Sequence, residues 1–318
     1  MVQPQVKTVW RNVNGIVLLD KALGVSSNQA LQQVRRTYRA AKAGHTGTLD
    51  PLATGLLPLC LGEASKFAQG LLDADKTYTA RLCLGVTTAT GDAEGAELER
   101  KSVAFGLEDL NAVVARFTGQ LEQVPPMFSA LKHQGRPLYE LARQGIDIER
   151  QARKVMVYRL KVLGSSANDA GAVSSEAGQA WVDIEAKVSK GTYIRTLGQD
   201  IGAALGCGAH LSALRRTAVA GWTLADAATL DAMQGMDEAA LLARLLPTDA
   251  MLGSLPVVQI NAPQTVLFRN GGRVRCEAIG SEPKPDVAVR VYGENDFLGV
   301  ADLKNGVLHP VRLVSHAN

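Results

Sequence analysis

The chain has 318 residues, of which 46% are apolar and 20% charged, and its formal net charge is +3. This length and composition are those of a globular protein that can bury a sizeable core in one large domain and one small domain. The mild positive charge is compatible with a nucleic-acid partner but does not require one. The first residues lack a signal-peptide core, and no apolar run approaches ~20 residues, so we expect a cytoplasmic protein that does not enter membranes.

The residue types that most often bind metals are scattered along the chain. The four cysteines form no CxxC pair, and the five histidines are equally dispersed. Neither a zinc site nor a disulfide framework is therefore expected. Motifs for dinucleotide binding, nucleotide-phosphate binding and zinc proteases are also missing from the sequence. We expect a protein that uses no metal and no organic cofactor.

Strand-like and helix-like segments mix over the first 222 residues. Side-chain alternation predicts strands over residues 15–20, 76–84, 153–163 and 181–189. Amphipathic spacing predicts helices over residues 26–42, 63–74 and 107–117, and from Thr192 to Gly206. Ser26 or Ser27 is expected to cap the first helix and Thr192 the last. These segments do not alternate strictly, so the main body is predicted to be α+β.

Two segments of the main body are less regular. Residues 125–152 carry two prolines and several basic residues. Residues 164–179 consist largely of Gly, Ala and Ser, which indicates a mobile hairpin insertion with almost nothing to bury. Near residue 250 the pattern changes to short strands joined by tight turns such as GEND and KNG. We therefore expect a main domain over residues 1–250 and a small β-rich domain over residues 251–318.

One loop, GHTGTLDPLATG over residues 44–55, holds a lone acid, Asp50. Taken alone, Asp50 followed by Pro51 is typical of a turn or of a helix start. The residues before it indicate more than a turn. Two glycines permit close approach of the backbone, and His45 and two threonines supply hydrogen-bonding groups. The loop is therefore expected to surround a polar ligand.

Residues 44–67, GHTGTLDPLATGLLPLCLGEASKF, closely resemble the signature of the TruB family of tRNA pseudouridine synthases. Three further segments resemble the other motifs of this family in the same order: LLDKALGVSSNQAL (18–31), DKTYTARLCLGVTTATGDAEG (75–95) and SKGTYIRTLGQDIGAALGCGAHLSALRRTAVAGW (189–222). The tail resembles the small RNA-binding module of the PUA kind. The resemblance implies a catalytic domain built on a mixed, mainly antiparallel sheet, followed by a PUA-like domain.

The resemblance also implies the reaction, isomerisation of uridine 55 in the T-loop of tRNA to pseudouridine. This reaction consumes no redox equivalent and transfers no phosphate, so a carboxylate suffices in principle and no coenzyme is needed. By similarity Asp50 is the nucleophile, and whether it attacks the ribose or the base stays open. Tyr78 is assigned to stacking on the target base and to helping a proton move. Taken alone, Tyr78 would be predicted as a core residue of its strand.

Arg195 lies in the first turn of its predicted helix, where the helix dipole disfavours a cation. This placement suggests that an anion faces the helix start, and the resemblance pairs Arg195 with Asp50. Tyr193 and Leu214 match positions that line the uracil pocket, and His45 matches a position that contacts the RNA. Asp92 is interpreted as a turn acid without a catalytic role.

Basic residues flank the Asp50 loop in the sequence. Residues 21–49 contain five Lys or Arg and no acid, and residues 132–161 contain eight against three acids. This pattern fits a groove that contacts RNA phosphates. The resemblance suggests that residues 125–152 close over the T arm of tRNA, and we expect the enzyme to act as a monomer.

Two alternatives remain open from the sequence. The protein could be a tRNA-binding folding factor, an RNA chaperone whose catalysis is secondary. A glycoside hydrolase that uses Asp50 would need a second carboxylate, and the core motif contains none.

Overall fold

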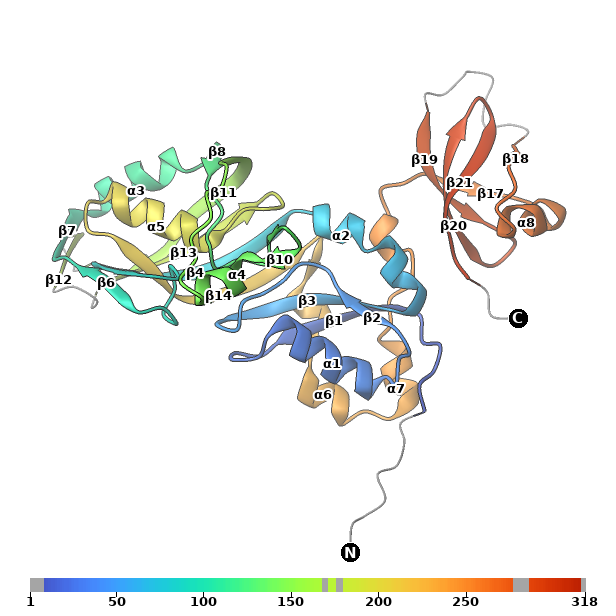
Figure 1. Ribbon diagram of the computed structural model, residues 1–318, viewed down its shortest axis with the longest axis horizontal. Helices are drawn as coiled ribbons and strands as arrows, with labels where there is room; N and C mark the ends of the chain where they lie inside the picture. Colours follow the sequence, from blue (N-terminus) through green and yellow to red (C-terminus); the bar gives the residue numbers. More distant parts are fainter. Residues whose placement is uncertain (1–8, 168–170, 176–179, 277–285, 316–318) are drawn as a thin grey trace, which may run out of the picture.

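The computed structural model describes residues 9–167, 171–175, 180–276 and 286–315, and Figure 1 shows a main body and a smaller C-terminal unit. The main body is built on a ten-stranded mixed sheet. Its central path runs through β16 (Ala228–Thr229), β1 (Gly15–Lys21), β3 (Ala53–Leu61), β14 (Ala209–Val219), β4 (Lys76–Leu84), β13 (Trp181–Val188), β11 (Arg153–Ser165) and β8 (Gly119–Gln123). The pairs β1–β16 and β3–β14 are parallel, and the other pairs on the path are antiparallel. The α+β prediction is therefore confirmed.

The predicted strand alternation is also confirmed. On β13 the inward residues Val182, Ile184 and Ala186 are almost fully buried, and they pair with Leu82, Ala80 and Tyr78 of β4. Successive side chains of a strand point to opposite faces, so one face of this strand pair enters the core. Helices α3 (Leu107–Arg116) and α5 (Ile194–Ala204) cover the sheet near β13 and β4 (Figure 1).

At the other end of the sheet lie α1 (Ser27–Thr37), α6 (Leu230–Gln234) and α7 (Glu238–Ala243) (Figure 1). Ser26 caps α1 as predicted, because its side chain accepts a hydrogen bond from the Gln29 N–H. The predicted end at residue 42 is wrong. The helix ends at Thr37, and Arg39 adopts a φ of 52°, which a continuing helix does not allow.

Two other helix predictions need correction. The expected helix over 63–74 is split into a 3₁₀ turn, η1 (Gly62–Phe67), and α2 (Gln69–Asp73). Thr192 does not cap α5, because its hydroxyl donates to the Ser189 carbonyl, and Tyr193 is the N-cap of α5, which begins at Ile194. The end of α5 agrees with the prediction, since Gly206 adopts a φ of +80°.

The segment 164–179 buries more than its composition suggests. Its residues Ala172–Ser175 form β12, which pairs antiparallel with β7 (Val103–Gly106). Val173 is 1% exposed and belongs to the main core. The prediction of an insertion with almost nothing to bury is therefore wrong for this strand. The mobility predicted for residues 164–179 stays a prediction, and residues 168–170 and 176–179 of this segment lie outside the described residues.

Two short strands complete the ten-stranded sheet, and two others form a separate two-stranded sheet. β2 (Ala43–His45) pairs with β3, β15 (Trp222–Thr223) pairs with β14, and β5 (Val86–Thr88) pairs with β6 (Glu97–Arg100). The irregular segment 125–152 contains the small hairpin of β9 (Lys132–His133) and β10 (Arg136–Pro137), followed by α4 (Leu138–Arg143). In Figure 1 β10 and α4 lie in front of the main sheet.

The C-terminal unit has its own sheet and its own core. Its strand order is β17 (Val257–Gln259), β19 (Val287–Tyr292), β20 (Phe297–Lys304), β21 (Val307–Leu313) and β18 (Val274–Arg275). The sequence did not predict α8 (Ala262–Arg269), although Asn261 and Gln264 form a capping box at its start. Phe268 of α8 is fully buried in the core of this unit.

The C-terminal unit contacts the main body at η1, directly after β3. The Lys66 ammonium donates to the Leu313 carbonyl at 3.1 Å and to the Ser315 hydroxyl at 2.7 Å. The Phe67 and Phe297 rings meet edge to face, with centroids 5.3 Å apart. Among the described residues no helix is long and apolar enough to span a membrane.

Candidate active site

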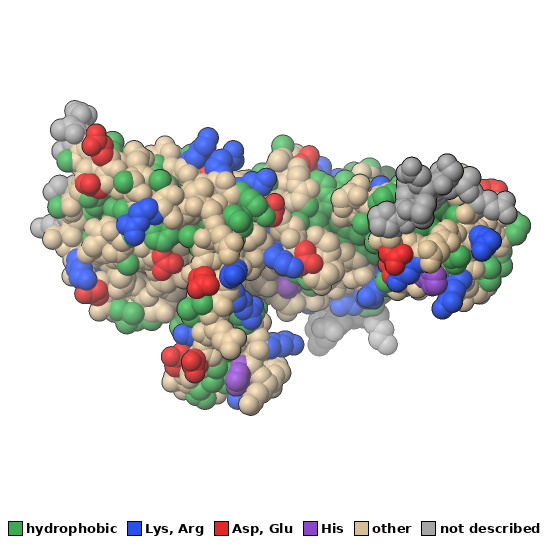
Figure 2. Space-filling model, turned by 90° about the horizontal axis from the view of Figure 1, so that it is seen from above, with side chains coloured by type: hydrophobic (Ala, Val, Ile, Leu, Met, Phe, Trp, Pro, Cys, Tyr) green, Lys and Arg blue, Asp and Glu red, His purple; other side chains and the backbone are tan. Residues whose placement is uncertain are grey.

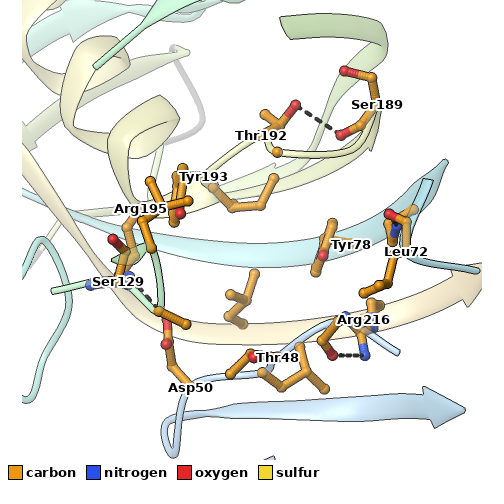
Figure 3. A pocket seen from close by; sticks show the side chains of 18 of the residues that line it. Thr48, Asp50, Leu72, Tyr78, Ser129, Ser189, Thr192, Tyr193, Arg195 and Arg216 are labelled. Carbon is orange, nitrogen blue, oxygen red and sulfur yellow. Dashed lines mark hydrogen bonds and ion pairs between the residues drawn. The ribbon is translucent and has the colours of Figure 1, made fainter. Parts of the chain in front are cut away.

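A cavity of about 410 Å³ opens beside the Asp50 loop. Its walls come from residues 45–50, from β4 and β14, from residues 129–131 and from the start of α5. These segments are far apart in the sequence, and Figure 3 shows Asp50, Tyr78, Tyr193, Arg195 and Arg216 around one space. The structure therefore brings the predicted site residues together in a single pocket.

Two buried hydroxyl groups hold the loop before Asp50. The Thr46 hydroxyl donates to the Pro58 carbonyl of β3 at 3.0 Å. The Ser27 hydroxyl at the start of α1 accepts from the Leu49 N–H at 2.8 Å and donates to the Leu49 carbonyl at 2.9 Å. The loop is thus tied both to the sheet and to α1, which limits the positions that Asp50 can take.

Arg195 faces Asp50 as the sequence predicts. Its Nε lies 3.0 Å from Asp50 Oδ2, and Arg195 itself is only 5% exposed. Its two terminal nitrogens donate to the Thr90 carbonyl at 2.9 Å and to the Phe128 carbonyl at 2.6 Å. With these contacts the guanidinium is held by two separate loops, so its direction toward Asp50 is defined.

Asp92 completes this network, although the sequence interpretation gave it no catalytic role. It is 3% exposed, and its Oδ2 lies 3.7 Å from Arg195 Nε. Its other oxygen accepts from the Thr90 hydroxyl and from the Glu94 N–H. Asp92 reaches Arg195 because its segment bridges to Leu211 of β14, more than a hundred residues later. Its position inside the TGDAEG motif was the one sequence signal for this role.

The pKa of Asp50 is raised above its ordinary value. Burial in the pocket is the largest cause, and the negative charge of Asp92 acts in the same direction. The charges of Arg195 and Lys21 lower the pKa of Asp50 but do not outweigh burial. Asp50 is therefore a partly buried carboxylate beside a fixed cation, which is an environment expected for a reactive group.

Two aromatic rings and one apolar side chain face the pocket above Asp50. Tyr78 lies on β4 and Leu214 on β14, in antiparallel strands that pair directly. Tyr193 precedes α5, and the side chain of Gln123 bonds to both its N–H, at 2.9 Å, and its carbonyl, at 3.2 Å. Figure 3 shows Tyr193 beside Arg195 and Tyr78 across the space, toward Arg216. Such surfaces suit the stacking of a planar base.

His45 lines the pocket from β2. Its Nδ1 is buried and makes no hydrogen bond to any described residue. Burial is the main cause that lowers the pKa of His45, and the charge of Arg216 lowers it further. The imidazole is therefore neutral at pH 7.

Two buried lysines lie close to the pocket and were not expected from the sequence. The Lys21 ammonium donates to the carbonyls of Ala22 and Val25, and the Lys76 ammonium to those of Leu71, Leu72 and Ala74. Burial lowers the pKa of each lysine to about 8. No cluster of three His, Cys, Asp or Glu residues suitable for a metal ion occurs within the part of the chain that the structure describes.

The fold is that of the pseudouridine synthases, with a PUA-like β unit at the C-terminal end. A chain of an H/ACA RNP bound to a substrate RNA containing 2′-deoxyuridine superimposes with a TM-score of 0.67, covering 95% of this chain and 85% of that one. A chain of a Cbf5–Nop10–Gar1 complex superimposes with a TM-score of 0.65, covering 99% of this chain and 90% of that one. Both are 23% identical to this chain, so the likeness concerns the fold.

Family models match three consecutive parts of the chain. They are "TruB family pseudouridylate synthase (N terminal domain)" over residues 35–194, "tRNA pseudouridylate synthase B C-terminal domain" over 195–253 and "Pseudouridine synthase II TruB, C-terminal" over 256–314. The chain belongs to the TruB family of pseudouridylate synthases.

Among its relatives are two proteins named tRNA pseudouridine synthase B. The protein from Dechloromonas aromatica (strain RCB) is 50% identical over 99% of this chain and 100% of its own length. The protein from Ralstonia pickettii (strain 12J) is 50% identical over 98% of this chain and 97% of its own length.

Proposed function

We propose that this protein isomerises uridine to pseudouridine at position 55 in the T-loop of tRNA, with Asp50 as the nucleophile. The protein is thus an isomerase that modifies tRNA, in line with the printed name of its relatives. The observation that carries the proposal is the Asp50–Arg195 pair at 3.0 Å, in a pocket lined by Tyr78, Tyr193 and Leu214.

The chemistry requires one bond to break and one to form. The N1–C1′ glycosidic bond breaks, the uracil turns, and a C5–C1′ bond forms, while a proton leaves C5 and N1 gains one. Asp50 forms a transient covalent bond to the substrate, and this bond breaks again before the product leaves, so that the free carboxylate is restored. Arg195 lowers the pKa of Asp50 relative to an unpaired carboxylate in the same pocket, and it keeps Asp50 pointed into the cavity. Which substrate atom Asp50 attacks stays open.

The target uridine must leave the stack of the T-loop before it can enter the pocket. Extruding a base costs a few kcal/mol. The rings of Tyr78 and Tyr193 and the side chain of Leu214 offer a surface that offsets this cost by stacking and apolar contact. Tyr78 also carries a hydroxyl, and we assign it to the movement of the C5 proton. His45, neutral and with an unused Nδ1, contacts the RNA beside the extruded base.

The RNA surface is assigned to the basic segments around the pocket. Lys and Arg side chains occur along the molecule from the main body to the C-terminal unit, interspersed with acids (Figure 2). The segment 125–152 closes over the T arm, and it already touches the site, because its Phe128 carbonyl accepts a hydrogen bond from Arg195. Residues 251–318 act as a PUA-like RNA-binding domain beside a catalytic domain of residues 1–250. The enzyme works as a monomer in the cytoplasm, where its tRNA substrate is found.

The experiment that tests the proposal maps pseudouridine at single-nucleotide resolution after incubation of the purified protein with unmodified tRNA. We expect conversion at position 55 and at no other uridine of the T arm. Conversion at a different uridine would contradict the proposed position. Binding without conversion at any uridine would favour the folding-factor alternative.

A further inference from the structure

The pocket contains a second buried arginine that the proposed chemistry does not use. Arg216 is 1% exposed and is one of the largest fully buried side chains of the described protein. It lies on β14 two residues after Leu214, so both side chains point to the same face of the sheet. Figure 3 shows Asp50 and Arg216 toward opposite ends of the pocket, with Thr48 between them.

Arg216 differs from Arg195 in the partners of its charge. Its Nε donates to the Leu56 carbonyl at 2.7 Å and its Nη2 to the Gly47 carbonyl at 3.3 Å. Among the described residues no carboxylate lies within ion-pair distance of Arg216, whereas Arg195 has both Asp50 and Asp92. A buried cation without a counter-charge is unfavourable, so an anion from outside the chain would be stabilised beside it.

The surroundings of Arg216 are also positive. The charge of Arg216 lowers the pKa of Lys21, of Lys76 and of His45. Lys76 and Arg216 both line the pocket. Lys76 directs its ammonium to backbone carbonyls and not to an acid. This end of the pocket therefore combines two buried cations, and the other end holds the carboxylate.

One nitrogen of the Arg216 guanidinium makes no hydrogen bond to the described backbone. Nη1 takes part in neither of the two hydrogen bonds to the loop and to β3. A β-carbon added at Gly47 would lie 3.6 Å from Nη1, so a longer side chain there would cover this nitrogen. On the other side, Gly55 of β3 pairs with Arg216, and a β-carbon there would lie 2.3 Å from the Arg216 carbonyl. Two glycines of the loop motif thus allow Arg216 to pack against the loop while Nη1 keeps its hydrogen-bonding capacity.

We propose that Arg216 forms a phosphate subsite, in which Nη1 binds one backbone phosphate of the RNA next to the extruded uridine. The proposal rests on the proposed function, because it requires that the target uridine enters this pocket. A guanidinium already held by two carbonyls binds a phosphate oxygen with little further ordering. The base then lies against Tyr78, between the phosphate at the Arg216 end and Asp50 at the other.

The test replaces one phosphate at a time. A series of synthetic T-arm hairpins is prepared, and each hairpin carries one neutral methylphosphonate at a different linkage around the target uridine. Binding is measured to Asp50→Asn protein, in which the RNA is not converted, with and without Arg216→Gln. We expect one position at which neutralisation weakens binding about tenfold with Arg216 present and less than about twofold with Arg216→Gln.

Arg215→Gln is the matched control. Arg215 is the next residue of the same strand, faces the other side and already pairs with Asp20 at 2.7 Å. Arg216→Gln should reduce the slope of log affinity against log salt by about 0.7–0.9, and Arg215→Gln should leave it unchanged. Circular dichroism and thermal melting check that each variant folds. Arg216→Lys, which keeps the charge, covers the case in which Arg216→Gln does not fold.

The proposal would be overturned if, at every linkage, the methylphosphonate reduced RNA affinity equally in the protein with Arg216 and in the Arg216→Gln protein. So would a scan in which no single methylphosphonate weakens binding to the Arg216 protein, a result that needs no variant at this position. The pseudouridine map separates this proposal from the proposed function. If the map shows another target uridine, the assignment of position 55 is wrong. The same methylphosphonate scan around the mapped uridine then decides the role of Arg216.

Discussion

Asp50 lies in a loop that offers no second acid to replace it. We predict that Asp50→Asn abolishes pseudouridine formation and changes tRNA affinity by less than about tenfold, which corresponds to ~1.4 kcal/mol. The amide keeps the size and polarity of the side chain but is not a nucleophile. Single-turnover conversion and equilibrium binding of the same tRNA measure the two effects. Turnover at the wild-type rate would rule out the nucleophile assignment.

Asp92 acts on Asp50 through charge as well as through Arg195. Asp50 must be ionised to react, so the single-turnover rate should fall as the pH drops through its pKa, which lies above the ordinary 3.8. Asp92 raises the pKa of Asp50. We therefore predict that Asp92→Asn moves the acid-side midpoint of the rate to lower pH, and that it also slows the reaction because Arg195 is less firmly held.

The pH profile separates this effect from a structural one. Loss of folding alone would lower the rate at every pH without moving the midpoint. Loss of the Arg195 orientation alone would move the midpoint to higher pH, because Arg195 lowers the pKa of Asp50. Glu97→Gln is the control, since Glu97 is exposed on β6 and pairs with Arg100 at 2.6 Å. A midpoint that is the same in all three proteins would contradict the electrostatic role of Asp92.

At the scale of elements, Lys76 joins the start of β4 to the end of α2. Its ammonium donates to three carbonyls of that helix end, at 2.6–3.1 Å. The pKa of Lys76 is about 8 in the folded protein, compared with 10.5 for an unperturbed lysine. Between these two values the unfolded chain binds more protons than the folded one, so the free energy of unfolding rises with pH.

We predict that Lys76→Met removes this contribution, which amounts to at most about 1.4 kcal/mol per pH unit. Urea unfolding between pH 8 and 10.5 measures the slope in the wild type and in the variant. Lys190→Met is the matched control, because Lys190 is an exposed lysine that pairs with Asp73. An equal slope in the wild type and in Lys76→Met would show that Lys76 does not titrate in this range.

At the scale of the molecule, the C-terminal unit has a separate sheet and a separate core, and it meets the main body at η1. None of the described residues that line the Asp50 pocket comes from it. We predict that removal of residues 254–318 leaves the main body folded and the single-turnover rate at saturating RNA near normal. Affinity for whole tRNA should fall, and the truncated protein should discriminate less between tRNA and a T-arm hairpin.

The salt dependence of binding measures how many phosphate contacts the truncation removes, at a slope of about 0.7–0.9 for each. Arg269 and Arg290 pair with Asp296 and Asp249, so Arg273 and Arg275 are the better candidates for such contacts. The full-length variant with Arg273→Gln and Arg275→Gln should reproduce part of the change in slope. Loss of the saturating rate in a truncated protein that is still folded would place the C-terminal unit in the active site.

Local patterns in the sequence were sufficient for the features that depend on neighbouring residues. The alternation on β4 and β13, the Ser26 cap of α1 and the turn at Gly206 all follow from side-chain direction and backbone preference over a few residues. The family motifs added the residues Asp50, Tyr78, Tyr193, Arg195 and Leu214, which the structure places in one pocket.

The tertiary structure alone decided the contacts that join distant segments. Asp92 meets Arg195 because its loop bridges to β14, and Val173 is buried because β12 pairs with β7. Arg216 resembles any arginine of an exposed strand in the sequence, yet the parallel pairing of β3 with β14 encloses it beneath the Asp50 loop. Such burial depends on which strands become neighbours in the sheet. The spacing of apolar residues, every two residues in a strand or every 3.6 in a helix, carries no information about which strands become neighbours.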